Sequence, residues 1–259
     1  MGSPLAPAST GGVSVVAKVG LVLRTLGAAE AEGATTTAVA RHCGLPRPTA
    51  HRLLTDLAEQ GLVDRDRDTG RWQLGPELFL LGALAAARYN VTDHARDVLA
   101  DLAEQTGESA YLSALRDRET VCLAECEGSF PLRSHVLHEG IRFPLGVASA
   151  GLAILAHLPP SEAEDYLATT DLTIRWGEAH SEHAVRSRLA AARDSGYAVN
   201  PGLVVEGSWG VAAAVFDGAG RPRSALSLTG VRSRFTDERI PMVGRLLLER
   251  AHALSKLDR

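Results

Sequence analysis

The stretch from position 44 to 61 reads Gly44-Leu-Pro-Arg-Pro-Thr-Ala-His-Arg-Leu-Leu-Thr-Asp-Leu-Ala-Glu-Gln-Gly61. Its apolar residues recur at helical spacing and form one stripe, made of Ala50, Leu53, Leu54 and Leu57. The opposite side carries polar residues together with one proline, namely Pro48, His51, Arg52 and Thr55. The pattern predicts an amphipathic helix between two glycine breakers, and its polar side suits the major groove of DNA.

The charge is distributed unevenly along the chain. The whole sequence carries a formal net charge of -4, which argues against a protein that coats nucleic acid nonspecifically. Positions 41–52, however, contain three arginines and no acidic residue. This local positive patch is sufficient for phosphate contacts, although the solvated face of an ordinary helix is the alternative interpretation.

The neighbouring segments predict a winged helix-turn-helix. A helix over 13–29 and a short helix capped by a threonine at 35–37 precede Gly44, which permits a tight turn. After Gly61 two strand-like runs flank the turn Asp68-Thr69-Gly70, so Arg65, Arg67 and Arg71 are expected near the tip of a wing. The interleaved aspartates 64, 66 and 68 would repel phosphates and would partly satisfy these arginines.

The segment Glu77–Ala87 is almost wholly apolar. A helix that is apolar all round must be covered from more than one side, and a partner subunit would cover it while bringing two DNA-reading heads together. Packing between the chain's own two domains is the alternative.

The remainder of the chain mixes strands and helices without strict alternation, which indicates an α+β domain. A helix from Thr92 is expected to turn His94, Val98, Leu99 and Leu102 inward, and residues 110–115 and 120–126 are expected to form a hairpin. Leu132–Leu137 predicts a further strand, and 143–146 predicts a loop that leads into a helix at Ser149.

The order of these parts resembles the IclR family of bacterial transcriptional regulators over residues 13–257. The resemblance is carried by Leu45–Leu54, Arg71–Gly75, Gly196–Val199, Ala213–Asp217 and Ala225–Gly230. It implies an α+β protein with a winged helix-turn-helix domain (13–75) and a GAF/profilin-like effector-binding domain (92–259). The small residues and prolines of 1–12 predict a flexible tail, and the apolar connector predicts a linker and dimerisation helix (76–91). The resemblance also implies a homodimer or a dimer of dimers.

Candidate site residues follow from the helix and from the resemblance. The expected DNA contacts are Arg47, Pro48, Thr49, His51, Arg52, Arg65 and Arg71. The resemblance places the effector at Ser149, Ala150, Gly151, Asn200, Gly210, Ser227 and Thr229, where the start of a helix would face a carboxylate. Asn200 replaces an aspartate of relatives, and Gly210 replaces a cysteine, which is expected to leave more room beside Trp209.

Cys122 and Cys126 suggest a second class of function, a GAF-like redox sensor or enzyme. A continuous strand would place both on one face about 13 Å apart, too far for the roughly 4.4–6.8 Å that disulfide Cα atoms require. Buried inert thiols are therefore favoured. We find no catalytic motif, no metal-ligand spacing with a third ligand, and no signature of a cofactor.

The sequence as a whole predicts a ligand-responsive transcriptional regulator, a repressor or a dual regulator, and not an enzyme. Its expected partners are double-stranded operator DNA and a small organic or aromatic acid. No run of residues is long and apolar enough to span a membrane, and three cysteines fit a reducing compartment, so the expected location is the cytoplasm.

Overall fold

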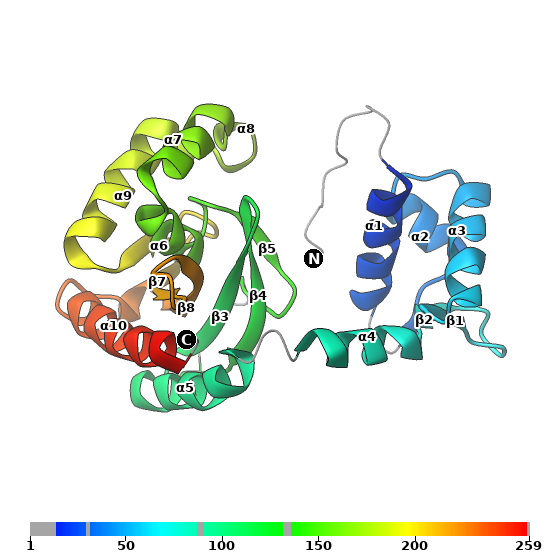
Figure 1. Cartoon of the computed structure of the whole chain (residues 1–259), viewed down its shortest axis with the longest axis horizontal. Coiled ribbons are helices and arrows are strands. Elements are labelled where there is room, and N and C mark those ends of the chain that lie inside the picture. The colour runs from blue at the N-terminus through cyan, green and yellow to red at the C-terminus, as the bar shows by residue number, and fades with distance from the viewer. Residues whose placement is uncertain (1–13, 30–31, 87–90, 132–135, 258–259) are drawn as a thin grey trace. The chain divides into compact units, whose positions relative to one another are not determined.

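The computed structural model describes residues 14–29, 32–86, 91–131 and 136–257. The chain divides into two compact units, Met1–Tyr89 and Asn90–Arg259 (Figure 1). The tail predicted at 1–12 lies outside the described residues. Within the described part of the chain, no helix combines the length and the apolar character that a bilayer crossing requires.

The first unit is built from helices and one short hairpin. Its elements are α1 (Val15–Gly27), α2 (Thr36–His42), α3 (Arg47–Glu59), β1 (Val63–Arg65), β2 (Trp72–Leu74) and α4 (Pro76–Ala86). The side chains of Ser14 and Thr35 cap α1 and α2 by accepting from backbone amides in the first turn. Gly44 adopts φ +62° between α2 and α3, the left-handed conformation that the predicted turn requires.

The core of the first unit holds α3 against the other two helices and the hairpin. The predicted apolar stripe of α3 is buried, and Leu54 is fully buried between Val22, Val39 and Trp72 of one cluster. Trp72 donates its indole N–H to Thr36 Oγ1 at 2.9 Å, so the largest side chain of this core has its polar atom satisfied. An isolated bridge between Ala34 and Trp72 attaches the α1–α2 connection to the hairpin.

The second unit is organised around a six-stranded antiparallel sheet with the order β5-β4-β3-β8-β7-β6. The strands are β3 (Ser109–Arg116), β4 (Glu119–Cys126), β5 (Arg142–Pro144), β6 (Ala198–Pro201), β7 (Ser208–Phe216) and β8 (Pro222–Val231). The long strands β7 and β8 pair with each other, and β8 also pairs with β3. Residues far apart in the sequence therefore become neighbours at the centre of the sheet.

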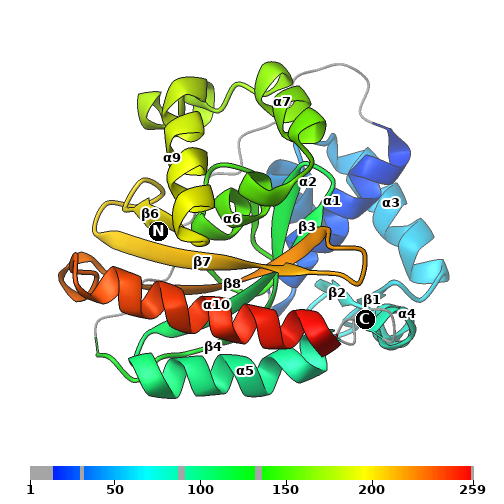
Figure 2. The same cartoon turned by 60° about the vertical axis from the view of Figure 1, so that its left-hand side comes forward.

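Helices cover both faces of this sheet (Figure 2). One face packs against α5 (Val91–Thr106) and α10 (Arg239–Leu257) around Leu112, Leu226 and Leu247. The other face packs against α6 (Ser149–His157) and its neighbours, with Ala212, Ala225 and Leu152 in the cluster. The remaining elements are α7 (Pro160–Thr169), α8 (Thr173–Trp176), η2 (Glu178–His180), α9 (Glu182–Ser195) and η3 (Arg232–Arg234).

Three local expectations require correction. His94 is exposed on α5 and Ala95 faces inward in its place, whereas Leu99 and Leu102 are buried as expected. The strand expected at Leu132–Leu137 is not observed at its described end, since Val136 lies in a turn, and its residues 132–135 lie outside the described part. The strand of this region is β5, which overlaps the first two residues of the loop expected at 143–146, because Arg142 to Pro144 pair with the edge of β4.

Candidate functional site

The outer face of α3 presents polar side chains, and the two arginines among them are not engaged by other described residues of the unit. Arg47, Pro48, His51 and Arg52 are exposed, and Thr49 is half-buried. Among the described residues no ion pair or hydrogen bond holds the guanidinium of Arg47 or Arg52. Both groups are therefore available to phosphates or base edges. The His51 ring stands edge-on to Trp72, with ring centroids 6.4 Å apart, and so links the helix to the hairpin.

The turn of the hairpin is built by an aspartate. Asp66 Oδ1 accepts from the amides of Thr69 at 2.6 Å and Asp68 at 3.0 Å, and from the Thr69 hydroxyl at 2.8 Å. These hydrogen bonds, led by that from the Thr69 amide, lower the pKa of Asp66 below its ordinary value. The negative charge of Asp66 is thus satisfied within the turn itself.

Backbone carbonyls engage the two wing arginines that the sequence singled out. Arg65 donates to Gly70 O at 3.3 Å and lies over the Trp72 ring, 5.4 Å from its centroid. Arg71 donates to Gly33 O at 3.0 Å and so braces the wing against the α1–α2 connection. The expectation that neighbouring aspartates would satisfy these arginines is therefore corrected, since the acceptors are carbonyls.

Arg67 is the wing residue that the sequence-based candidate list omitted. It is exposed in the turn between β1 and β2, and no contact to another described residue holds its side chain. Its position beside the Asp68-Thr69-Gly70 turn could have predicted this exposure, because a side chain at a hairpin tip has few neighbours.

In the second unit, the sheet gathers the predicted ligand residues on the α6 face. Strand register places Asn200 opposite Gly210, and Gly210 opposite Thr229. Ser227 pairs with Ala212, whose side chain belongs to the cluster around α6, so Ser227 and Thr229 point toward this helix. The residues come from separate segments, and only the pairing of β6, β7 and β8 brings them together.

The hydroxyls of Ser227 and Thr229 are buried without a partner. Ser227 is 0% exposed and Thr229 is 6% exposed, and neither side-chain oxygen forms a hydrogen bond of ordinary geometry with another described residue, although the Thr229 hydroxyl lies near enough to the Tyr111 phenol to affect its pKa. An unsatisfied buried polar group costs about 1–3 kcal/mol. Two such groups on one strand face make this a candidate site for a polar ligand, which could supply the missing partner.

Ser109 and Tyr111 extend this polar group onto β3 and were not among the sequence candidates. In the register of β3 and β8, Ser109 lies opposite Thr229, and Tyr111 lies opposite Ser227. Burial raises the pKa of the Tyr111 phenol, and the nearby hydroxyls of Thr229 and Ser109 only partly oppose this rise. The phenol therefore remains protonated and can donate a hydrogen bond. Because Ser109 and Tyr111 are two positions apart in a strand, the sequence could have predicted that they share a face.

The side chain of Asn200 is held by the protein at both ends of its amide. Its Nδ2 donates to Val147 O at 2.6 Å, and its Oδ1 accepts from Leu203 N at 2.9 Å. Both ends of this buried amide are thus in use, and Asn200 fixes the turn that precedes α6.

Gly210 makes room for a protein side chain. A Cβ at this position would lie 2.9 Å from Ser149 Oγ, so the space left by the missing side chain is occupied by Ser149. Trp209 packs with the cluster on the opposite face of the sheet, because successive residues of a strand point to opposite sides. The expectation of a widened site beside Trp209 is therefore wrong.

The start of α6 supplies backbone donors on the same face. Ser149, Ala150 and Gly151 are buried, and the N-cap residue Ala148 makes no side-chain cap. The first amides of a helix have no partner within the helix, and they carry the positive end of its dipole. An anionic group is therefore favoured at this position next to the hydroxyls.

The cysteines do not form a reactive pair. Register places Cys122 opposite Ser113 and Cys126 opposite Ala110, and a shift at Leu112/Ser113 lies between these pairs. The two thiols therefore lie on opposite faces of the sheet, which corrects the single face expected from a continuous strand. Burial, the main cause, raises the pKa of Cys122 to about 12, so the thiolate is disfavoured. The described residues also contain no group of three potential metal ligands.

A winged helix-turn-helix followed by a sheet domain with a buried polar site is the architecture of a transcriptional regulator with a sensor domain. Residues 15–67 match the IclR helix-turn-helix domain, and residues 83–256 match the bacterial transcriptional regulator IclR C-terminal domain. The chain belongs to the IclR family of transcriptional regulators. Its fold is α+β, with the GAF/profilin-like second domain of that family.

Individual relatives agree with this assignment. The chain is 30% identical to the HTH-type transcriptional regulator BhcR of Paracoccus denitrificans (strain Pd 1222), covering 88% of this chain and 81% of that protein. It is 29% identical to the transcriptional repressor IclR of Escherichia coli (strain K12), covering 86% and 82% respectively. An IclR-type regulator from Alicyclobacillus acidocaldarius has a similar structure, with a TM-score of 0.79, 28% identity and coverage of 94% and 98%. These relatives are regulators, and the chain is not an enzyme.

Proposed function

We propose that this transcriptional regulator senses a small organic or aromatic carboxylate and acts as a repressor or a dual regulator of operator DNA. The observation that carries the sensing role is the pair of buried, unpartnered hydroxyls of Ser227 and Thr229 beside the start of α6. A ligand that binds one of two conformations more tightly shifts the protein toward it, which is sufficient for regulation. A regulator of operator DNA works in the cytoplasm.

The chemistry of the site supports a carboxylate. Its side-chain donors are hydroxyls, from Ser227, Thr229 and Tyr111, and the amides of Ser149 to Gly151 add the positive end of a helix dipole. We assign these residues to the effector, whereas Asn200 and Gly210 shape the site through Val147 and Ser149.

A paired ligand screen tests this assignment. Acetate, lactate and benzoate would be compared with acetamide, lactamide and benzamide by thermal shift on the full chain, since a bound ligand stabilises the folded state. We expect at least one acid to raise the Tm more than its amide, and Ser227→Ala/Thr229→Val to abolish that rise. A double variant that responds as wild type does would remove the effector from these hydroxyls.

The DNA-reading role is assigned to the outer face of α3 and to the wing. Arg47, Pro48, Thr49, His51 and Arg52 lie on α3, while Arg65 and Arg67 lie on the wing and Arg71 braces it. A helix in the major groove reads base edges, and a hairpin tip contacts phosphates.

Two arginine variants separate these roles. Duplexes selected from a randomised library by the purified protein would serve as operator DNA. Arg52→Ala should cost about 1–3 kcal/mol and relax the preference at one base pair. Arg67→Ala should weaken binding to all sequences evenly and reduce the slope of log K against log salt by about 1. Unchanged affinity and preference in Arg52→Ala would contradict the α3 assignment.

We infer that two copies of the chain assemble through α4. Large apolar side chains are exposed on this helix: Phe79 (78%), Leu80 (54%), Leu81 (48%) and Leu84 (74%). A dimer would cover them and set two reading helices on one DNA, and pairs of dimers would form a tetramer. Phe79→Ser/Leu84→Ser should yield monomers in sedimentation velocity, and dimers of unchanged affinity would refute the α4 interface.

A further inference from the structure

A buried carboxylate lies one residue before Ser109, on the α5 and α10 side of the sheet and so on the opposite face from the proposed effector site. Glu108 precedes the first residue of β3 and follows the end of α5, and it is only 2% exposed. The next residue along the chain, Ser109, pairs with Thr229. A buried charge requires partners, because its transfer from water into the protein interior is strongly unfavourable.

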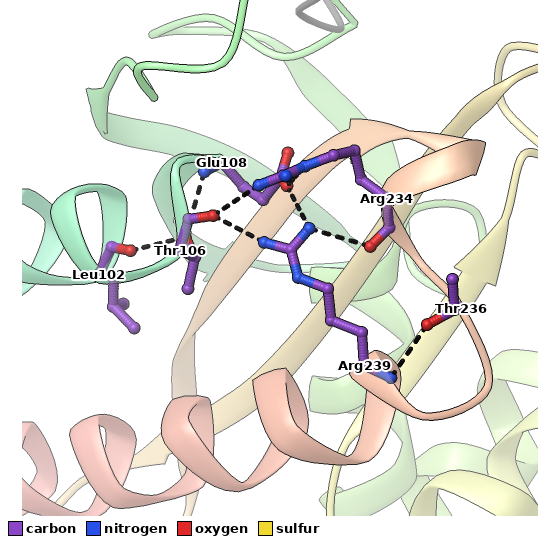
Figure 3. A network of polar contacts seen from close by, with 6 residues as sticks. All are labelled: Leu102, Thr106, Glu108, Arg234, Thr236 and Arg239. Atoms are coloured by element: carbon purple, nitrogen blue, oxygen red, sulfur yellow. Dashed lines mark hydrogen bonds and ion pairs between the residues drawn. The ribbon is translucent and has the colours of Figure 1, made fainter.

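Two arginines from the segment after β8 provide these partners (Figure 3). Glu108 Oε1 accepts from Arg234 Nε at 2.7 Å and from Arg239 Nη1 at 2.8 Å. The same two guanidiniums donate to Thr106 O, at 2.9 Å and 2.6 Å respectively. Four charge-assisted hydrogen bonds thus join the end of α5 to η3 and to the start of α10.

The carboxylate also lies against the backbone of β8 itself. A Cβ built on Gly230 would collide with the Glu108 carboxylate and lie 3.0 Å from Phe235 Cε2, so any side chain here would have to displace that carboxylate. Gly230 directly follows Thr229, which carries one of the two unpartnered hydroxyls. A displacement of β8 at Thr229 toward α5 and α10 would therefore move Gly230 against a carboxylate that Arg234 and Arg239 hold.

We propose that Glu108 is a positioning residue that couples the effector strand β8 to the last turn of α5, the first helix after the connector helix α4 in the sequence. The inference rests on the proposed function, because it gives the sensing site a physical route toward the DNA-reading half of the chain. Coupling of this kind requires that a change at one end alter the other end through the shared contacts.

A second ion pair between the same helices provides a matched control. Arg250 Nε of α10 donates to Asp101 Oδ2 of α5 at 2.6 Å. This pair also joins α10 to α5, but Asp101 precedes the end of that helix and does not neighbour a β8 residue in the register of the sheet. Asp101→Asn should loosen the helix pair without reaching the effector strand.

Hydrogen exchange on the full chain without ligand tests the coupling. The amide of Gly107, which donates to Ala103 O, reports on the last turn of α5. We expect Thr229→Val, which removes a hydroxyl of the effector site, to change the hydrogen-exchange rate of this amide by about threefold or more. The same substitution in a Glu108→Gln background should leave Gly107 exchange at the Glu108→Gln level, whereas in an Asp101→Asn background the change should persist.

The outcomes are decisive in either direction. If Thr229→Val does not alter exchange at Gly107, or alters it equally with and without Glu108, the coupling role is overturned. Arg239→Lys is the alternative variant if Glu108→Gln does not fold. It retains the positive charge but cannot donate to both Glu108 and Thr106, so it should reduce the effect of Thr229→Val on Gly107 exchange. Since no ligand is used, failure of the carboxylate screen and failure of the coupling are distinguishable.

Discussion

The outer face of α3 and the α6-facing side of β8 both carry polar side chains, but they differ in the exposure and the charge of those side chains. On α3, Arg47 and Arg52 are exposed and charged, and water satisfies them until DNA arrives. On β8, Ser227 and Thr229 are neutral and buried, and no described residue satisfies them. A binding face for a charged polymer can thus remain solvated at little cost, whereas a buried site for a small ligand carries unmet hydrogen bonds.

The largest effect expected from this comparison lies behind the DNA-reading face. Leu54 is fully buried behind the exposed side of α3, so Leu54→Ala should destabilise the first unit by about 2–5 kcal/mol. Hydrogen exchange should rise across residues 15–74 and remain unchanged in β7 and β8. Leu257→Ala, at a 59% exposed leucine of α10, is the size-matched control and should leave exchange in α3 unaltered. Loosening of both units by Leu54→Ala would show that they do not unfold separately.

Arginines that stabilise the first unit should differ in their mutant effects from arginines that contact DNA. Arg71→Ala removes the bond to Gly33 O and should lower the stability of the first unit by about 1 kcal/mol, with a measurable fall in its Tm. Arg47→Ala should leave the Tm unchanged and weaken DNA binding. If Arg47→Ala lowered the Tm as much as Arg71→Ala, Arg47 would have a stabilising role within the first unit, contrary to its assignment as a free DNA contact.

Two buried serines on paired strands sharpen the contrast on the sensor side. Ser227→Ala removes a hydroxyl without a partner and should stabilise the ligand-free protein by up to about 1 kcal/mol. Ser109→Ala instead leaves the buried Gly128 N–H without its acceptor at 3.1 Å and should destabilise the protein by about 1–3 kcal/mol. Chemical denaturation of both variants measures the difference, and equal losses would mean that Ser227 is satisfied in the ligand-free protein.

The smallest expected effect is the response of the wing to pH. The folded pKa of Asp66 is lowered, so its contribution is present above the ordinary carboxyl pKa and is lost as pH falls through the folded value. The Thr69 amide donates to Asp66 at 2.6 Å. At low pH its hydrogen exchange should therefore be faster than the intrinsic pH dependence of amide exchange predicts. Asp66→Asn should show no such acid dependence, and wild-type exchange that follows ordinary pH behaviour would remove Asp66 from the turn.

Local signals in the sequence predicted much of the first unit. Pro46 and Pro48 near the start of α3, the threonine cap of α2 and the glycine turn at Gly44 each act within a few residues, and the structure has them as expected. The wing arginines were harder to predict, because Arg71 bonds to Gly33 O, 38 positions away in the chain.

The sensor site depended on contacts that no local pattern contains. Asn200 bonds to Val147 across 53 positions, and Gly210 is filled by Ser149. Tyr111 and Ser109 became part of the site only because β3 pairs with β8. The register shift between β3 and β4 also placed Cys122 and Cys126 on opposite faces, where a continuous strand had predicted one.

The sequence by itself determined the amphipathic helix between Gly44 and Gly61, its turn, the wing and the family, because helical periodicity, glycine turns and ordered motifs are written in neighbouring residues. Tertiary structure alone decided which side chains remain free to bind. Ser227 lacks a partner, Asn200 has two, and Glu108 is held by Arg234 and Arg239 over Gly230. The reason is that hydrogen-bond satisfaction in a buried sheet depends on strand order and register, which join residues more than a hundred positions apart.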